Sequence, residues 1–451
     1  MSARKTYRQH SRALLVLGLP LIGSHLAQMA IGITDNLMLG RYSVEALAAG
    51  TLGFSMSFVL FIVGSGFAFA VLPMVAGAMA EGDETQVRRV TRMGMWISVL
   101  FGLVAMAPMI WSEPLLLALG QQPEIAVLAA QYLSILAIGM APNLVVMVLK
   151  NYLAALERTQ FILWVTVVAA VINGVLNYAL IFGNLGAPEL GLRGAAIASV
   201  SMQIATMLVI AIYCARATPE HALFQRFWRF DSEGFARVFR LGWPIGLTNL
   251  AESGLFSATA LMMGWIGALS LAAHGIAIQL ASVTFMVHLG FSQAATVRVG
   301  NAMGRKDGAG LRMGAKVAVA ISVGFASLTV AVYLAIPETL LGLFLDAGDP
   351  DRPAILVIGV GLLAMAALFQ LVDGAQVIAL GLLRGVQDTR VPMIHAAISY
   401  WLVGIPASYL FGIWLGWGGV GIWMGLVVGL ACAAALLMQR FWTRGVARVP
   451  L

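Results

Sequence analysis

The sequence predicts an all-α polytopic membrane protein, with twelve transmembrane helices arranged as two homologous six-helix bundles. Of its 451 residues, 60% are hydrophobic and only 10% are charged, and the mean hydropathy is +0.91. A soluble chain carries about 25% charged residues. Apolar runs long enough to cross a bilayer recur along the whole chain. The first half of the chain also repeats in the second half, which indicates an internal duplication.

The duplication is clearest where residues 17–49 recur without a gap as residues 241–273. Eleven positions are identical at this offset: Leu17, Gly18, Pro20, Leu26, Ala27, Leu37, Met38, Gly40, Leu47, Ala48 and Ala49. A weaker repeat pairs LGLRGAAI at 190–197 with LGWGGVGI at 415–422. We expect an N-terminal bundle over 1–215, a linker over 216–240 and a C-terminal bundle over 241–451. An even number of helices in each bundle makes the halves parallel, related by an axis along the membrane normal.

The individual spans follow from the apolar runs, because about 20 apolar residues cross a bilayer. They are expected at 14–38, 46–74, 92–112, 125–149, 160–183, 192–215, 238–263, 270–297, 315–337, 354–381, 391–413 and 416–439. The basic N-terminus precedes an apolar run that is too long for a cleavable signal, so this run is interpreted as the first span. Cys214 and Cys432 both lie in apolar stretches, which excludes a disulfide framework and a Cys-rich metal site.

Basic residues alternate between the loops. Of the 27 Lys and Arg residues, only Arg41, Arg193 and Arg352 fall in the loops on one side, and the termini and all the other loops hold the rest. The positive-inside rule then predicts a multi-pass protein of the cell inner (cytoplasmic) membrane with both termini in the cytoplasm. The net charge of +7 therefore reflects topology, and no nucleic-acid partner is expected. The linker 216–240 is expected to lie as a basic strip along the anionic leaflet.

Three acidic residues, Asp35, Glu252 and Asp373, lie inside predicted spans. A carboxylate near mid-membrane costs about 3 kcal/mol even on a lenient insertion scale, so it needs a partner, a proton or a water-filled cavity. No Lys or Arg is expected at the depth of Glu252 or Asp373. We therefore expect these carboxylates to bind and exchange a proton or a sodium ion, both of which suit oxygen ligands. For Asp35, near the outer end of its span, a structural cap is an alternative.

The acids do not follow the repeat, since Asp35 corresponds to Thr259 and Glu252 to Gln28. Asn173 and Asn177 are four residues apart on one helix face and could join Asp35 as oxygen ligands. The alternative is that they only form an interhelical hydrogen bond. Further polar candidates inside spans are Gln28, Gln279, Gln293, Gln370, Gln376 and Asn143. His25, His274, His288 and His395 have no metal-binding spacing and are expected to be packed, so no transition metal is expected.

The sequence contains no motif of a hydrolase, metalloprotease or nucleotide-binding enzyme. A primary pump would need an ATP-binding domain, and no polar segment is longer than the linker 216–240. An intramembrane aspartyl protease would need a catalytic pair, but Asp35 and Asp373 lie in different halves without the expected glycine-flanked motif. We therefore expect a protein that is not an enzyme and has no cofactor.

Several motifs together resemble the multidrug and toxic compound extrusion (MATE) transporters. They are TDNLMLG at 34–40, ALAA at 46–49 and GLRGAA at 191–196. Glu252, FQLVDGAQ at 369–376 and LRGVQDT at 383–389 resemble the bacterial NorM-type branch. The resemblance covers essentially the whole chain. It implies two bundles around a V-shaped central cavity, and export of cationic, amphipathic compounds in exchange for Na+ or H+ by alternating access. We expect a protein that functions as a monomer in the lipid bilayer.

The resemblance also implies roles for individual residues. Asp35 with Asn173 and Asn177 would form a cation site in the N-terminal bundle. Glu252 and Asp373 would form a second site, with Na+ as one candidate ion, in the C-terminal bundle. Residues expected to line the substrate cavity are Gln28, Gln279, Phe369, Gln370 and Gln376. A tyrosine found in some sodium-coupled relatives is Phe369 here, which has no hydroxyl, so the choice between Na+ and H+ stays open.

Three alternatives remain. A lipid-linked oligosaccharide flippase of the same superfamily would be expected to line its cavity with several Arg or Lys residues. No basic residue is expected deep within a span, which disfavours a flippase. A narrower metabolite exporter would share the fold. A receptor or scaffold that binds a ligand without moving it would leave the duplication and the asymmetric acids unexplained.

Overall fold

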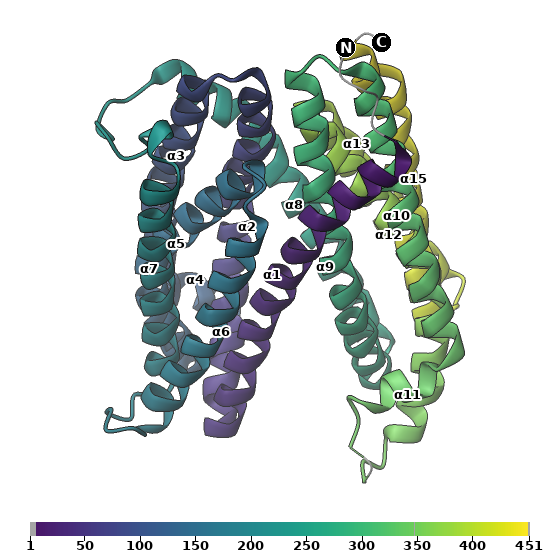
Figure 1. Ribbon diagram of the computed structural model, residues 1–451. Coiled ribbons are helices and arrows are strands. Elements are labelled where there is room, and N and C mark those ends of the chain that lie inside the picture. Colours follow the sequence, from purple (N-terminus) through teal and green to yellow (C-terminus); the bar gives the residue numbers. More distant parts are fainter. Residues whose placement is uncertain (1–5, 347, 450–451) are drawn as a thin grey trace. The chain divides into compact units, whose positions relative to one another are not determined.

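The computed structural model describes residues 6–346 and 348–449, and the regular elements in this part of the chain are helices (Figure 1). The elements that precede the linker, and one short element within it, are α1 (Tyr7–Tyr42), α2 (Val44–Glu81), α3 (Glu84–Ile110), α4 (Ser112–Ala118), α5 (Pro123–Ala155), α6 (Thr159–Phe182), α7 (Gly191–Ala217) and η1 (Pro219–His221). The elements that follow it are α8 (Ser232–Ile266), α9 (Ala268–Gly304), α10 (Gly308–Ala335), α11 (Pro337–Gly342), α12 (Arg352–Gly385), α13 (Arg390–Ala397), η2 (Ile398–Gly404), α14 (Ile405–Tyr409), η3 (Leu410–Trp414), α15 (Gly418–Arg440), η4 (Phe441–Gly445) and η5 (Val446–Arg448). Of these, η2, η3 and η4 have π-helical geometry.

The predicted twelve-helix membrane fold is present. Within the described residues, 11 helical segments are long and apolar enough to cross a membrane. The expected seventh span is α8, which has 35 residues but a less apolar composition. Polar residues such as Asn249, Glu252 and Ser253 lower its hydropathy. The long helix α8, which lacks a stretch as apolar as those of the other spans, is therefore one that carries a predicted ion-binding acid.

Several helices continue beyond their apolar runs. The spans expected to end at 74 and 297 run on to Glu81 and Gly304, and the helix expected to begin at 92 begins at Glu84. The predicted loops 76–92 and 298–316 are therefore mostly helical. Asp83 caps α3 by accepting a hydrogen bond from the Gln86 amide at 2.9 Å. In the matching position of the repeat, Asp307 accepts one from the Gly310 amide at 2.8 Å. A side-chain cap lets the chain turn sharply, so little loop is needed.

The weaker repeat is also visible in the backbone. Glu157 and Gln387 follow α5 and α12 with positive φ angles of 61° and 56°. The next amides, those of Arg158 and Asp388, each donate to a carbonyl five residues earlier at 2.9 Å. The same helix-ending turn thus closes two helices 230 residues apart, which supports the duplication.

By their internal contacts the residues form two compact units. Unit 1 contains Met1–Ile22 and Leu247–Leu451, and unit 2 contains Gly23–Gly246. Both boundaries fall inside a helix, α1 and α8, at equivalent positions of the repeat. The first part of α1 thus belongs to unit 1 and the first part of α8 to unit 2. The predicted bundles, 1–215 and 241–451, follow the sequence repeat, whereas the two compact units divide within α1 and α8. The predicted bundle boundaries therefore stay a prediction.

In unit 1, the start of α1 packs closely against α9. A Cβ atom added to Gly18 would lie 3.0 Å from Cδ1 of Phe291. A Cβ added to Gly290 would meet the backbone of Ile22 at 2.9 Å. His10 lies beside Arg298, with 3.4 Å between Nδ1 and Nη2. Small residues at these crossings let the two helices approach closely.

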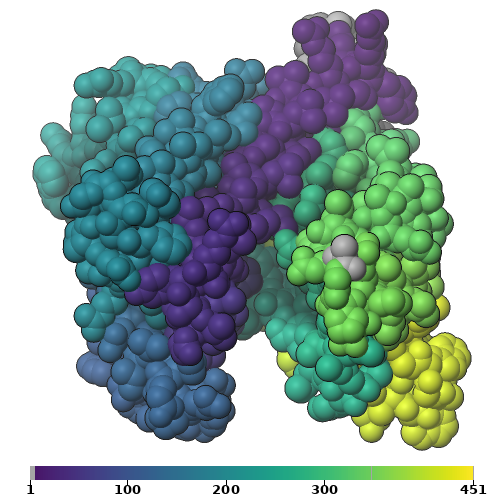
Figure 2. Space-filling model, turned by 90° about the horizontal axis from the view of Figure 1, so that it is seen from below, coloured from purple at the N-terminus to yellow at the C-terminus, as the bar shows by residue number. Residues whose placement is uncertain are grey.

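In unit 2, the core is rich in small residues from α2, α5 and α7, among them Ala49, Ala129 and Ala196, which have no exposed surface. The rest of α1 packs against α6, where the hydroxyls of Ser24 and Thr166 are 3.0 Å apart. Figure 2 shows the purple atoms of this part of α1 beside the blue-teal atoms of the same unit. This packing positions Asp35, eleven residues further along α1.

Candidate functional site

In unit 2, the structure brings together the three residues predicted for the first cation site. The Nδ2 atom of Asn177 donates to Oδ1 of Asp35 at 2.5 Å and lies 3.2 Å from Oδ1 of Asn173. Both asparagines are fully buried on α6. The hydroxyl of Ser199, on α7, is a second hydrogen-bonding partner of Asp35. The sequence analysis did not single out Ser199, because one serine in an apolar helix is a common packing residue.

This cluster retains free hydrogen-bonding capacity. Within the described chain, Nδ2 of Asn173 and Oδ1 of Asn177 are buried and have no partner. Asp35 is itself only half-buried. An ion that reached Asp35 would therefore find carboxylate and amide oxygens on two helices, which are ligands suited to a hard cation.

In unit 1, Glu252 on α8 lies beside Asp373 and Gln376 on α12. The Nε2 atom of Gln376 donates to Oε1 of Glu252 at 3.3 Å. Asp373 and Gln376 have no exposed surface. Asp373 is close enough to Glu252 to interact with it electrostatically. The two acids predicted to form the second site therefore come together in the fold, although 121 positions separate them in the sequence.

The second cluster has an unusual set of buried polar atoms. Within the described residues, both carboxylate oxygens of Asp373, both polar side-chain atoms of Gln370 and Oε1 of Gln376 lack a hydrogen-bond partner. Most buried polar groups in folded proteins have a partner, and leaving one unpaired costs stability. A bound proton, cation or water molecule would satisfy these oxygens.

The expectation that no basic residue lies near Glu252 is wrong. Arg384 was assigned to a loop, but α12 continues to Gly385 and places Arg384 in its last turn. Its Nη2 atom donates to Oδ1 of Asn249 at 3.0 Å, and its charge interacts with Glu252. Lys150, also assigned to a loop, lies within α5. The apolar run ended before the helix did, which is why both residues were placed too far out.

Tyr400 is a member of the second cluster that the sequence analysis missed. It lies on η2, is fully buried, and its hydroxyl has no partner in the described chain. It interacts electrostatically with Glu252, Asp373 and Arg384. Its neighbour Trp401 holds η2 against α8 by donating to the Ala251 carbonyl at 3.1 Å. Only the fold shows that this tyrosine faces the acids, because helical periodicity does not identify the neighbouring helix.

The residues predicted to line a substrate cavity differ in how far the structure exposes them. Gln28 is exposed on α1 and Gln279 is half-buried on α9, whereas Phe369 and Gln370 are buried on α12. Phe369 packs edge-on against Trp423, with 5.5 Å between ring centroids. This geometry places Phe369 in an aromatic core, and the cavity-lining role of these residues stays a prediction.

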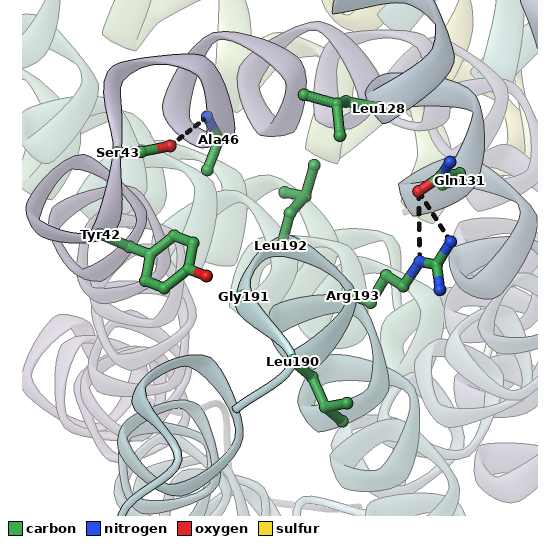
Figure 3. A pocket seen from close by; sticks show the side chains of 9 residues that line it. All are labelled: Tyr42, Ser43, Ala46, Leu128, Gln131, Leu190, Gly191, Leu192 and Arg193. Atoms are coloured by element: carbon green, nitrogen blue, oxygen red, sulfur yellow. Dashed lines mark hydrogen bonds between the residues drawn. The ribbon is translucent and has the colours of Figure 1, made fainter. Parts of the chain in front are cut away.

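Unit 2 also contains a cavity of about 220 Å³ where α1 ends and α2 and α7 begin (Figure 3). In Figure 3, Arg193 points toward Gln131, and its Nε and Nη2 atoms donate to Oε1 at 3.2 and 3.0 Å. At the same cavity, the Ser43 hydroxyl caps α2 by accepting a hydrogen bond from the Ala46 amide. None of the predicted cation-site residues lines this cavity, and no carboxylate is among its lining residues. It is therefore separate from the ion-binding chemistry.

A duplicated set of membrane-crossing helices, with a carboxylate cluster in each unit, is typical of a membrane transporter. Comparison with known proteins identifies the family. The family model described as MatE matches residues 20–179 and 244–410. The chain belongs to the MATE family, and within it to the NorM-type branch, so it is a transporter and not an enzyme.

Two similar relatives illustrate the match. The "probable multidrug resistance protein NorM" of Rhizobium meliloti is 48% identical over 436 residues, which is 96% of this chain and 93% of the relative. A protein of the same description from Agrobacterium fabrum is 44% identical and covers 98% and 95% of the two chains.

Solved structures share the fold at low sequence identity. An outward-facing multidrug resistance MATE family transporter of the MOP superfamily superposes with a TM-score of 0.88 at 19% identity, covering 98% of this chain and 97% of that one. The eukaryotic MATE transporter AtDTX14 gives a TM-score of 0.86 at 18% identity, covering 98% of each chain. These matches confirm the predicted fold class.

Proposed function

We propose that this protein is a secondary active multidrug efflux antiporter, which exports cationic, amphipathic compounds in exchange for Na+ or H+. Family membership and the relatives described as multidrug resistance proteins support the efflux activity. The observation that carries the antiport is Asp373, a fully buried carboxylate whose two oxygens lack a partner in the described chain. Such a group requires a proton or a cation when it lies inside a membrane.

The unit 1 cluster would bind the coupling ion. Asp373 and Glu252 supply negative charge, and Gln370, Gln376 and Tyr400 supply neutral oxygens. A proton would neutralise a carboxylate directly, whereas Na+ would need several of these oxygens at once. Arg384 next to Glu252 opposes the accumulation of positive charge at that end of the cluster. We therefore assign the ion mainly to Asp373, with Glu252 as its partner.

The unit 2 cluster would provide a second cation site. Its carboxylate, Asp35, is already held by the amide of Asn177, so its orientation is fixed before an ion arrives. Preorganised ligands lose less conformational entropy when the ion binds. Export is driven if the ion and the drug have different affinities for two conformations of the transporter, since a ligand shifts an equilibrium only by its differential affinity.

The distribution of Lys and Arg supports the orientation with both termini in the cytoplasm, and the inner membrane as the location. We propose that the protein functions as a monomer, because each carboxylate cluster is formed within one chain. Fluorescent labelling of a cysteine added at either terminus, with a reagent that cannot cross the membrane, tests the orientation. Labelling in intact cells would contradict it.

The function is tested by ethidium efflux from proteoliposomes, with Na+ and H+ gradients imposed separately. One gradient is expected to drive efflux, and Asp373→Asn and Glu252→Gln are expected to abolish that dependence while the protein remains folded. Asp351→Asn is the matched control, since this exposed aspartate precedes the same helix. Full gradient-driven export by Asp373→Asn would refute the proposed coupling.

The same assay separates the alternative functions. Gradient-driven transport of one metabolite but of no cationic dye would indicate a narrower exporter. Movement of a lipid-linked oligosaccharide that does not depend on either gradient would indicate a flippase. Arg384 is the basic residue of the unit 1 cluster to which such an anionic substrate could bind, and it already contacts Asn249.

A further inference from the structure

The linker between α7 and α8 is fastened along one side of α3. The guanidinium of Arg92 donates to three linker carbonyls, from Nε to Leu223 at 2.6 Å, and from Nη2 to Ala222 at 2.5 Å and to Gln225. One turn further along α3, Nε1 of Trp96 donates to the Phe227 carbonyl at 3.0 Å. These contacts define the path of a segment that has little regular structure of its own.

Further bonds fix both ends of the linker. Near its start, the Tyr152 hydroxyl lies 2.8 Å from Oγ1 of Thr218 and 2.5 Å from Nδ1 of His221. Near its end, Nε of Arg89 binds Oδ2 of Asp231 at 2.5 Å. The Arg89 guanidinium holds the pKa of the Asp231 carboxyl below its usual value. The linker is therefore an ordered element.

The side of α3 that holds the linker continues as a lipid-facing surface. At 100° per residue, Arg89, Trp96, Leu100 and Leu103 share one face of the helix. Leu100 and Leu103 are 41% and 55% exposed. A run of exposed leucines along one face of a membrane-crossing helix is typical of a surface that lipid covers. The linker covers the same face two turns closer to the polar end of the helix, where the headgroups of lipid packed on these leucines would lie.

The outer surface of the linker is both aromatic and basic. Trp228 and Phe230 are 77% and 52% exposed, and Phe224 is also exposed. Arg226 and Arg229 are exposed between them, and neither forms an ion pair within the described chain. The neighbouring acids are already engaged, since Asp231 and Glu233 bind Arg89. We define Phe224, Arg226, Trp228, Arg229 and Phe230 as the linker surface.

We propose that the linker surface is a binding site for anionic phospholipid headgroups of the adjacent leaflet. The indole ring of Trp228 has a polar edge and favours the membrane–water interface, and the exposed Phe224 and Phe230 rings add apolar surface that can enter the edge of the bilayer. Arginine binds phosphate through paired hydrogen bonds, so Arg226 and Arg229 would hold the headgroup phosphates. Basic residues beside a membrane are attracted to anionic lipid. This site requires no transport and is independent of the proposed function.

The experiment measures contact with each kind of lipid directly. A bimane fluorophore is attached to Trp228→Cys in the full-length protein, with Cys214 and Cys432 replaced by alanine. The protein is placed in two kinds of vesicle that contain the same fraction of brominated lipid. The brominated lipid is phosphatidylglycerol in one kind and phosphatidylcholine in the other. Because the arginines enrich anionic lipid locally, quenching by the phosphatidylglycerol is expected to be about twofold stronger or more. Replacing both Arg226 and Arg229 by glutamine should abolish this difference.

A matched control uses Leu185→Cys, on the exposed turn between α6 and α7, where no basic cluster is present. Bimane at this position should show equal quenching by the two lipids. Equal quenching at position 228 would refute recognition of anionic lipid. Absence of quenching by either lipid would place the linker in water and refute the proposal entirely. Unchanged thermal unfolding of the double glutamine variant shows that any loss of preference is not misfolding.

Discussion

The missing side chain of Gly374, the residue after Asp373, lets His288 reach the backbone of α12. A Cβ atom at this position would lie 2.6 Å from Cε1 of the His288 ring. The Ser322 hydroxyl lies 3.0 Å from Nδ1 of His288 and 3.3 Å from the Gly374 carbonyl. One glycine therefore determines how α9 and α10 pack beside the predicted ion site.

Substituting Gly374→Ala should destabilise the protein by about 1–3 kcal/mol, because overpacking a dense core forces neighbouring groups apart. Thermal unfolding in detergent measures the change. Gly324→Ala on α10 is the control, since a Cβ there meets no atom within 4 Å and alanine favours a helix more than glycine does. Equal unfolding temperatures for the two variants would contradict this account of the contact.

Substituting Tyr400→Phe should leave folding stability within about 0.5 kcal/mol of the wild-type value, since the hydroxyl has no hydrogen bond to lose. The ion concentration for half-maximal efflux should rise roughly three- to tenfold if this oxygen helps to bind the ion. Gradient-driven efflux at varied ion concentration measures it. Tyr409→Phe, an exposed tyrosine on α14, is the control. An unchanged ion dependence would exclude Tyr400 from the site.

At this scale the sequence identified residues whose chemistry is costly in a membrane. Asp35, Glu252 and Asp373 were identified because a carboxylate inside a membrane needs a proton, a cation or another partner. Asn173 and Asn177 were identified because residues four positions apart lie on the same face of a helix. Tyr400 and Ser199 could not be found in this way, since both are common in apolar helices. Their importance depends on which helix lies opposite, and no local pattern encodes that.

At the scale of elements, the linker shows how one arginine can order a segment without regular structure. Arg92→Gln should loosen the linker, because charged hydrogen bonds contribute about 1.5–3 kcal/mol each. Tryptic cleavage after Arg226 and Arg229 should then be roughly tenfold faster or more, as expected for a segment that opens more often. Arg88→Gln, one residue before Arg89 on the same helix, is the control. Equal cleavage rates would contradict the role of Arg92.

The attachment of the linker at His221 should depend on pH. Burial lowers the pKa of His221 from its usual 6.5, although the nearby Glu220 and Glu84 partly oppose this effect. The neutral ring is therefore favoured in the folded linker. Its contribution is complete above pH 6.5 and is lost as the pH falls below that value.

The rate of hydrogen exchange of residues 218–223, corrected for the intrinsic effect of pH, should therefore increase as the pH is lowered from 8 to 5. His221→Gln removes the titrating group but keeps polar atoms, and its corrected exchange should not change with pH. The same pH profile in the wild type and the variant would show that another group controls the linker.

The helix boundaries show why elements are only partly predictable. Hydropathy marks where a helix enters or leaves the membrane, whereas the first helical residue depends on caps such as Asp83 and Asp307, which lie beyond the apolar run. α12 likewise continues past its apolar run to the turn at Gln387, which is why Arg384 was assigned to a loop. The π-helical segments η2, η3 and η4 were not predicted either, since no periodicity in their sequences distinguishes a π-helix from an α-helix.

At the scale of the molecule, the repeat predicted the duplicated helical fold, because identical residues at a constant offset imply the same local structure twice. It did not predict that α1 and α8 each divide between the two compact units. Pro20 and Pro244 lie just before these divisions at equivalent positions. Periodicity shows which residues are helical and says nothing about the unit in which each half of a helix packs.

A chain cut within the linker should therefore stay assembled. Unit 1 needs residues 1–22 from the first fragment, and unit 2 needs the start of α8 from the second. After cleavage at a protease site inserted at 224–230, the two fragments should migrate together in a native gel. They should also unfold in one transition. Separation of the fragments without denaturant would contradict the shared packing.

The shared helices also determine the order in which the protein can fold during synthesis. Unit 2 is a continuous stretch, Gly23–Gly246, and can be completed as soon as the start of α8 has left the ribosome. The start of α1 packs instead against α9, where Gly18 lies beside Phe291, Ile22 beside Gly290, and His10 beside Arg298, 288 positions later. The segment made first must therefore wait, already inserted in the membrane, until the second half of the chain has been translated.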